Sequence, residues 1–418
     1  MTRTNSRRPL PATGRPWPEL RAHLEELKQD DADWRGGRTG AYVFWASDKM
    51  LEMAKTAHTM FFSENGLSPK AFPRLARLAR EVLEHSADLL QGDHAVGSLT
   101  SGGTESIMVA VKTARDAMVA ERGITSPEMV LPYSAHPAFN KAAHYLGIRA
   151  IRTPLTPTYE ADVAALEAAI TDHTVLVVGS APQYPHGVVD PIPAIAGLAA
   201  ARGIPCHVDA CVGGFCLPFL RRLGHDVGAF DFAVPGVTSM SADLHKFGFT
   251  AKGASVVLYR DEDLHRHQSF SFTDWPIGQY ASPTVTGTRP AGPIAAAWAV
   301  LHTFGMDGYL TLHADIMRIR DALFAGIRSV PDLEVWGEPV MGCFGYGSRE
   351  LDVAAIAEGM QELGWFVNRQ TDPAGIHMFV TPAHRPIIER YVDDLGTVTD
   401  EVRRGARRAH GDEPVRYA

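Results

Sequence analysis

Between positions 102 and 259, short apolar runs alternate with helical periods, and this alternation limits the possible folds most strongly. Val175–Val178 and Ile204–Val208 are typical of buried strands, whereas Thr104–Arg122 carries its apolar residues at helical spacing. Strands separated by helices predict a mostly parallel sheet covered on both faces. Active sites of such α/β sheets lie at the carboxyl ends of the strands.

A chain of 418 residues favours two domains. We expect an N-terminal tail and helical segment over 1–91, a large domain carrying the site over 92–292, and a smaller C-terminal α/β domain over 293–418. Within the first segment we interpret Met1 to Pro18, rich in Arg, Pro and Thr, as a flexible tail. We expect the last domain to begin with two helices, Pro293–Phe304 and Gly308–Ser329.

Composition excludes several classes of function. The net charge is -8, and no long basic block lies outside the termini, which argues against nucleic acid as the main partner. No apolar stretch approaches the roughly 20 residues of a membrane helix, and the amino terminus lacks the apolar segment of a secretory signal. Four cysteines without the spacing of a zinc site predict no metal centre and a reducing, cytoplasmic location: Cys206, Cys211, Cys216 and Cys343.

Lys246 is the residue that most directly indicates chemistry. It lies in Ser241–Phe249, after the apolar, strand-like run Phe230–Val234. A desolvated lysine has a lowered pKa, so more of it is the nucleophilic free amine. Such a lysine can form an imine with the aldehyde of pyridoxal phosphate. The alternative is a lysine whose amine reaches solvent at a strand end.

Four further segments fit a site of this kind. Ser101–Ser106 begins a predicted helix, where glycines and free N–H groups suit a phosphate. Asp209 follows a strand and can pair with a pyridine nitrogen, and the imidazole of His136 can stack on the ring. Thr286–Pro290 offers a second phosphate contact. Taken singly, these features also fit an ordinary helix start, a surface turn, a capping histidine and a loop.

Together these segments resemble the PLP-dependent group II decarboxylase superfamily, and within it most closely the sphingosine-1-phosphate lyases. The resemblance implies the aspartate-aminotransferase-like fold (fold type I) and a homodimer with shared active sites. The matching blocks follow the family's order and span more than half of the chain: Thr100–Ser106, Ala135–Ala142, His207–Phe215, Ser239–Gly248 and Tyr280–Gly292.

The resemblance also implies roles for individual residues. Lys246 would form the internal aldimine, Asp209 would pair with the pyridine nitrogen, and His136 would stack on the ring. Contacts to the cofactor phosphate would come from Gly103, Thr104 and His245, joined by Gly287 and Thr288 of the partner subunit.

On the substrate side, the resemblance places Tyr280 near the reacting groups and Lys252 at the substrate phosphate. Asn65 matches a substrate-binding element of the family, but Ser68 stands where the family carries a histidine. This departure leaves open a different substrate. We also expect no membrane anchor of the kind that eukaryotic members carry, and in this respect the sequence resembles the soluble bacterial forms.

We therefore expect a carbon–carbon lyase that cleaves sphingosine 1-phosphate, or a similar phosphorylated amino alcohol, to a fatty aldehyde and phosphoethanolamine. Three alternatives stay open. They are an amino-acid decarboxylase of the same superfamily, an aldolase acting on another amino alcohol, and a non-catalytic PLP-binding scaffold.

Overall fold

The computed structural model describes residues 9–410. Its larger sheet contains β1 (Val96–Thr100), β2 (Glu128–Pro132), β3 (Arg149–Thr153), β4 (Thr174–Ser180), β5 (Cys206–Asp209), β6 (Ser239–Ala242) and β7 (Ser255–Tyr259). These strands follow the order β1-β7-β6-β5-β4-β2-β3. Only β7 is antiparallel to its neighbours in this sheet. The predicted mostly parallel sheet is confirmed.

Helices accompany this sheet in the way that the alternating pattern predicts. They are α4 (Gly103–Arg122), α5 (Ala138–Leu146), α6 (Val163–Ala169), α7 (Ile192–Ala201), α8 (Leu217–Arg222) and α9 (Glu262–His265). Helix α4 packs on β4, β6 and β7, and α7 packs on β4 and β5. Every residue of β4 is buried, because a central parallel strand is covered on both faces.

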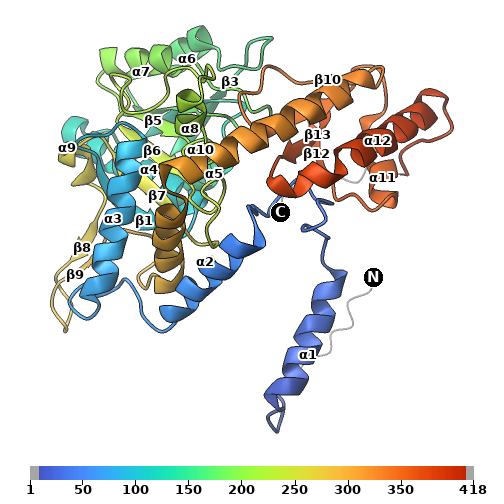
Figure 1. The fold of residues 1–418 in the computed structure, drawn as a ribbon. Coiled ribbons are helices and arrows are strands. Elements are labelled where there is room, and N and C mark those ends of the chain that lie inside the picture. Colours follow the sequence, from blue (N-terminus) through green and yellow to red (C-terminus); the bar gives the residue numbers. More distant parts are fainter. Residues whose placement is uncertain (1–8, 411–418) are drawn as a thin grey trace.

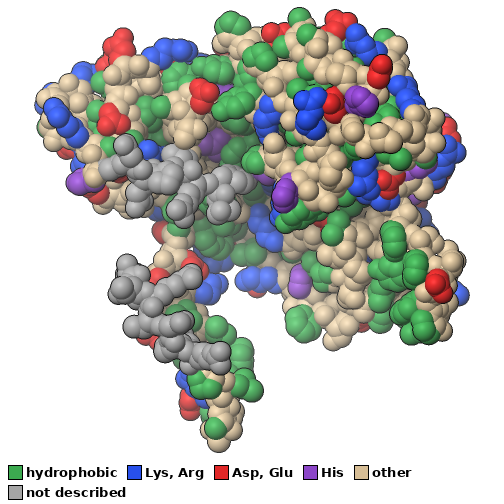
Figure 2. Space-filling view, turned by 180° about the vertical axis from the view of Figure 1, so that it is seen from behind, with side chains coloured by type: hydrophobic (Ala, Val, Ile, Leu, Met, Phe, Trp, Pro, Cys, Tyr) green, Lys and Arg blue, Asp and Glu red, His purple; other side chains and the backbone are tan. Residues whose placement is uncertain are grey.

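The segment before residue 92 is largely helical, as expected. It contains α1 (Trp17–Leu27), η1 (Lys28–Asp30), α2 (Asp48–Met60) and α3 (Pro73–Leu89). Helices α2 and α3 pack on α10 (Ala291–Ser329), whereas α1 buries no residue and extends away from the body (Figures 1 and 2). Part of the predicted tail, residues 1–8, lies outside the described residues.

Helix α10 unites the two helices that the sequence predicts after residue 292. Gly305 separates them with a non-helical backbone (φ 54°, ψ -170°), which glycine adopts more readily than other residues. The second half of α10 packs beside the smaller sheet and α12 (Ile388–Arg403). Within residues 9–410, none of the helices combines the length and the apolar composition that crossing a membrane requires.

A smaller antiparallel sheet follows in the order β10-β11-β13-β12. Its elements are β10 (Glu334–Val335), β11 (Cys343–Gly347), α11 (Val353–Glu362), β12 (Asn368–Thr371), β13 (Ala374–Phe379) and η2 (Pro382–Ile387). The N-terminal segment joins it, because the N–H of Phe379 donates to the carbonyl of Gly40 at 2.6 Å. The boundaries of the domains stay a prediction.

The predicted strand over Phe230–Val234 is wrong, since this segment forms turns. The carboxylate of Asp231 accepts hydrogen bonds from Gln91, Arg221 and the backbone N–H of Ala233. A buried aspartate that binds the backbone two residues ahead favours a turn over an extended strand. The strand that leads to Lys246 is β6 instead.

Candidate active site

A cavity of about 340 Å³ opens at the carboxyl ends of the parallel strands. This is the edge of the sheet at which the alternating pattern places an active site. Loops after β1, β2, β4, β5 and β6 contribute its walls. It brings together six residues that the sequence nominates: Gly103, Thr104, His136, Asp209, His245 and Lys246.

Lys246 lies in the turn after β6, and its Nζ is 2.9 Å from Oδ2 of Asp243. Burial disfavours the ammonium, but the negative charge of Asp243 outweighs burial and raises the pKa of Lys246 above its usual value. The expectation of a lowered pKa is therefore wrong for the chain without cofactor. The sequence indicates that Lys246 is buried, but it does not show which carboxylate lies beside the amine.

Asp243 is a site residue that sequence analysis missed. Its side chain is 1% exposed, and Oδ2 also lies 3.7 Å from Nε2 of His245. Burial acts to raise the pKa of this carboxyl, but Lys246 and His245 together hold the pKa below its usual value. The spacing of three residues between Asp243 and Lys246 was the available signal.

The start of α4 is shaped to admit a bulky anion. Gly102 has φ 156°, and a Cβ on Gly103 would lie 2.8 Å from Sγ of Cys211 and 2.9 Å from Oδ2 of Asp243. Side chains are thus excluded at both positions, so the backbone N–H groups stay accessible. With the N-terminal end of α4 behind it, the loop has the chemistry of a phosphate cradle.

Asp209 and His136 complete the cavity. Asp209 ends β5, and its Oδ1 accepts the backbone N–H of Cys211 at 3.1 Å. Nδ1 of His136 accepts the N–H of Ala138 at the start of α5, and burial lowers the pKa of this imidazole. A carboxylate, a flat ring, an amine and a phosphate cradle therefore surround one space, and this set fits pyridoxal phosphate.

Five other predicted residues, Lys252 among them, do not line this cavity in the single chain. Tyr280 lies on β9 (Tyr280–Ser282), which forms a hairpin with β8 (Phe270–Phe272). The loop that contains Gly287 and Thr288 follows, and Asn65 forms a β-bridge to its end at Pro290.

Hydrogen bonds fix that loop to Glu105 of α4, a buried residue that also lines the cavity. The backbone N–H of Thr286 donates to Oε1 of Glu105 at 3.0 Å. Asn65, Ser68 and Arg289 line a separate hollow of about 220 Å³. Asn65 thus lies in a different hollow from Lys246, whereas the loop of Gly287 and Thr288 borders the cavity wall at Glu105 without lining the cavity.

Lys252 lies beyond the cavity, at its His245 side. Nζ donates to the carbonyl of His245 at 3.1 Å and lies 4.9 Å from the ring centre of Phe44. The side chain stays open to solvent in part, yet the surrounding protein lowers the pKa of Lys252 to about 8, and the charge of Lys246 adds to this effect.

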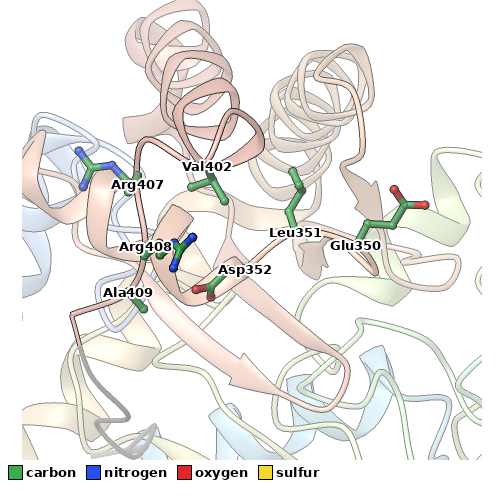
Figure 3. Close-up of a pocket in the computed structure, with 8 residues that line it drawn as sticks. Glu350, Leu351, Asp352, Val402, Arg407, Arg408 and Ala409 are labelled. Carbon is green, nitrogen blue, oxygen red and sulfur yellow. The ribbon is translucent and has the colours of Figure 1, made fainter.

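A wider cleft of about 1100 Å³ adjoins the cavity and shares His136 and Tyr184 with it. Its far wall is built by the small sheet, with Asn368 and Gln370 of β12. The cleft provides the cavity with a route to solvent. A different hollow of about 550 Å³, between Asp352 and Arg408, contains none of the predicted site residues (Figure 3).

Comparison with known proteins agrees with this geometry. The pyridoxal-dependent decarboxylase conserved domain matches residues 48–346. A sphingosine-1-phosphate lyase of Oryza sativa is 40% identical over 91% of this chain and 72% of its own length. A probable L-aspartate decarboxylase of Pyrococcus furiosus is 32% identical over 86% of this chain and 94% of its own length.

A solved structure supports the same family. The sphingosine-1-phosphate lyase of Burkholderia pseudomallei superimposes with a TM-score of 0.92 at 37% identity, covering 97% of this chain and 95% of that one. The predicted fold type I is confirmed. The chain belongs to the pyridoxal-dependent decarboxylase family and, within it, to the sphingosine-1-phosphate lyases.

Proposed function

We propose that this enzyme is a PLP-dependent lyase that cleaves sphingosine 1-phosphate, or a similar phosphorylated long-chain base, to a fatty aldehyde and phosphoethanolamine. The observation that carries the proposal is the convergence of Lys246, Asp209 and His136 on one cavity beside a glycine-rich helix start. The family of the chain supports cleavage of a carbon–carbon bond in an amine substrate.

Each of these cavity residues would bind a different part of the cofactor. Lys246 would hold the aldehyde carbon, Asp209 the ring nitrogen, and His136 one face of the ring. Gly103 and Thr104, with His245, would bind the phosphate. Once bound, pyridoxal phosphate supplies an electron sink for the bond that breaks.

Side chains of the protein would carry out proton transfer and substrate binding. The amine of Lys246, when it is not bound to the cofactor, would hold the proton that the reacting carbon receives. Asp243, 2.9 Å away, favours the protonated amine that this step requires. Lys252 would bind the substrate phosphate through a charge-assisted contact, and Tyr280 would assist at the hydroxyl group.

Tyr280, Gly287, Thr288 and Asn65 would act in the cavity of a second copy. None of these four residues lines the cavity of its own chain, and this supports a homodimer with shared active sites. Sedimentation of the holoenzyme tests the dimer, and a monomer that remains fully active would refute the sharing. The cytoplasmic location expected from the cysteines stays a proposal, which cell fractionation tests.

The reaction is tested by incubating holoenzyme with sphingosine 1-phosphate and, separately, with a panel of amino acids. We expect a long-chain aldehyde and phosphoethanolamine from the first. Carbon dioxide from an amino acid, without aldehyde, would favour a decarboxylase. Cleavage of another amino alcohol alone would indicate an aldolase with a different substrate, in keeping with Ser68. Protein that stays colourless and cannot be reconstituted with pyridoxal phosphate would favour the non-catalytic scaffold.

A further inference from the structure

Asp209 is held from one side by two donors that reach the same oxygen. Oδ1 accepts the backbone N–H of Cys211 at 3.1 Å and the hydroxyl of Ser241 at 3.3 Å. Within residues 9–410, no hydrogen bond to Oδ2 is formed. The carboxylate is therefore fixed in rotation, with Oδ2 left for a group inside the cavity that Asp209 lines.

Behind Ser241, a buried histidine continues the chain of hydrogen bonds. Nε2 of His207 lies 3.2 Å from Oγ of Ser241, and Nδ1 lies 2.9 Å from Oγ of Ser239. His207 is fully buried, and burial lowers its pKa to about 4, so the imidazole is neutral at physiological pH. A neutral imidazole has one donor and one acceptor.

These contacts allow one consistent direction of donation. Asp209 accepts only, so the hydroxyl of Ser241 donates to it and the oxygen of Ser241 accepts from Nε2–H of His207. Nδ1 of His207 then accepts the hydroxyl of Ser239. Two neighbouring strands thus build a polar chain that ends on the carboxylate, since β5 carries His207 and Asp209, and β6 carries both serines.

We propose that Ser241, oriented by His207, is a positioning residue that keeps Asp209 ionised and turned toward the pyridine nitrogen of the cofactor. The inference rests on the proposed function, because it assumes that Asp209 meets that nitrogen. Hydrogen bonds to the charged form of a carboxyl favour ionisation, and an ionised Asp209 favours a protonated ring. Without Ser241, the carboxylate loses a donor and Nε2–H of His207 loses its acceptor.

The experiment compares Ser241→Ala with Ser239→Ala and Ser86→Ala. Ser86 is an equally buried serine whose hydroxyl bonds within α3, away from the cavity. Each cofactor-free protein is titrated with pyridoxal phosphate for its dissociation constant. The visible absorbance of each loaded protein is then followed against pH, and melting temperatures report on general destabilisation.

For Ser241→Ala we expect a dissociation constant raised about tenfold and a shifted pH midpoint, because a hydrogen bond to a charged group is lost. Ser239→Ala should change both quantities less, and Ser86→Ala should change neither. Equal values for Ser241→Ala and Ser86→Ala would overturn the inference.

A second pair of variants separates the proposed hydrogen-bonding role from a general loss of folding. His207→Gln keeps a side-chain donor and acceptor, whereas His207→Leu removes both. We expect the pH midpoint of the visible absorbance to stay nearer to the wild-type value in His207→Gln than in His207→Leu. Identical midpoints in the two variants would contradict the proposed series of hydrogen bonds from Ser239 through His207 and Ser241 to Asp209. If the wild-type protein itself binds no pyridoxal phosphate, the proposed function fails rather than the positioning role.

Discussion

The cavity around Lys246 and the loop around Thr288 are built in opposite ways. In the cavity the polar groups are enclosed and paired, as in the ion pair of Asp243 with Lys246. Beside the loop, the β8–β9 hairpin and its turn expose Phe270 by 57%, Trp275 by 45% and Ile277 by 80%. One chain thus supplies most of the proposed cofactor contacts itself. The loop proposed to act in a partner's cavity instead lies beside uncovered apolar surface, which a dimer contact would cover.

We expect the largest loss of activity when the amine of Lys246, on the cavity side, is removed. We expect Lys246→Ala to reduce aldehyde release by about a thousandfold or more, because both the covalent attachment of the cofactor and the nearby proton donor are lost. Product formation measured by mass spectrometry checks this. Lys55→Ala, which removes a surface lysine paired with Glu52, should retain wild-type activity.

Asp243→Asn tests whether the cavity depends on its internal counter-ion. We expect kcat to fall by about 10- to 100-fold, since the protonated form of Lys246 loses its support. The raised pKa of Lys246 should fall at the same time, because burial then acts without the carboxylate.

The rate at which cofactor-free protein takes up pyridoxal phosphate reads this pKa directly. In Asp243→Asn, the increase of this uptake rate with pH should occur at lower pH, since the free amine of Lys246 forms at lower pH. Asp226→Asn, at an exposed turn, is the control and should leave the profile in place. An unmoved profile in Asp243→Asn would mean that the ion pair does not govern Lys246.

Mixing two defective chains tests whether the two regions belong to different subunits. Lys246→Ala damages the cavity, and Tyr280→Phe damages the hairpin side. If sites are shared, random re-pairing gives half of the dimers one intact site, so about a quarter of wild-type activity should return. Activity that never exceeds the average of the two parents would place Tyr280 in its own chain's site, or outside any site.

The smallest effect concerns Lys252 at the border of the two regions. Its pKa of about 8 means that the ammonium is present below that pH and is lost as the pH rises through it. KM for the phosphorylated substrate should therefore rise about threefold across this interval, as a charged contact to phosphate disappears. Lys252→Arg should keep KM flat, and a wild-type KM independent of pH would exclude a phosphate contact.

The sequence was sufficient where local pattern and position on the sheet decide the outcome. Asp209 and the start of α4 reach the cavity because parallel strands end at one edge. It was insufficient where distant groups meet in space. The pKa of Lys246 depends on the orientation of Asp243. The polar composition of β12 does not predict a strand, and its pairing with β13 makes it one.

The segment Phe230–Val234 resembles a strand by composition but forms turns. Phe230 and Phe232 are buried, but Asp231 between them organises a turn through its hydrogen bonds to Gln91 and Arg221. Burial and extended backbone are separate properties, and an apolar run predicts the first more safely than the second.

The central claim is that the amine of Lys246 carries pyridoxal phosphate. Reduction of the loaded enzyme with borohydride, followed by proteolysis and peptide mass spectrometry, tests it most directly. We expect a single pyridoxyl adduct on the peptide that contains Lys246. An adduct confined to other lysines, or a loaded enzyme from which no adduct can be recovered, would contradict it.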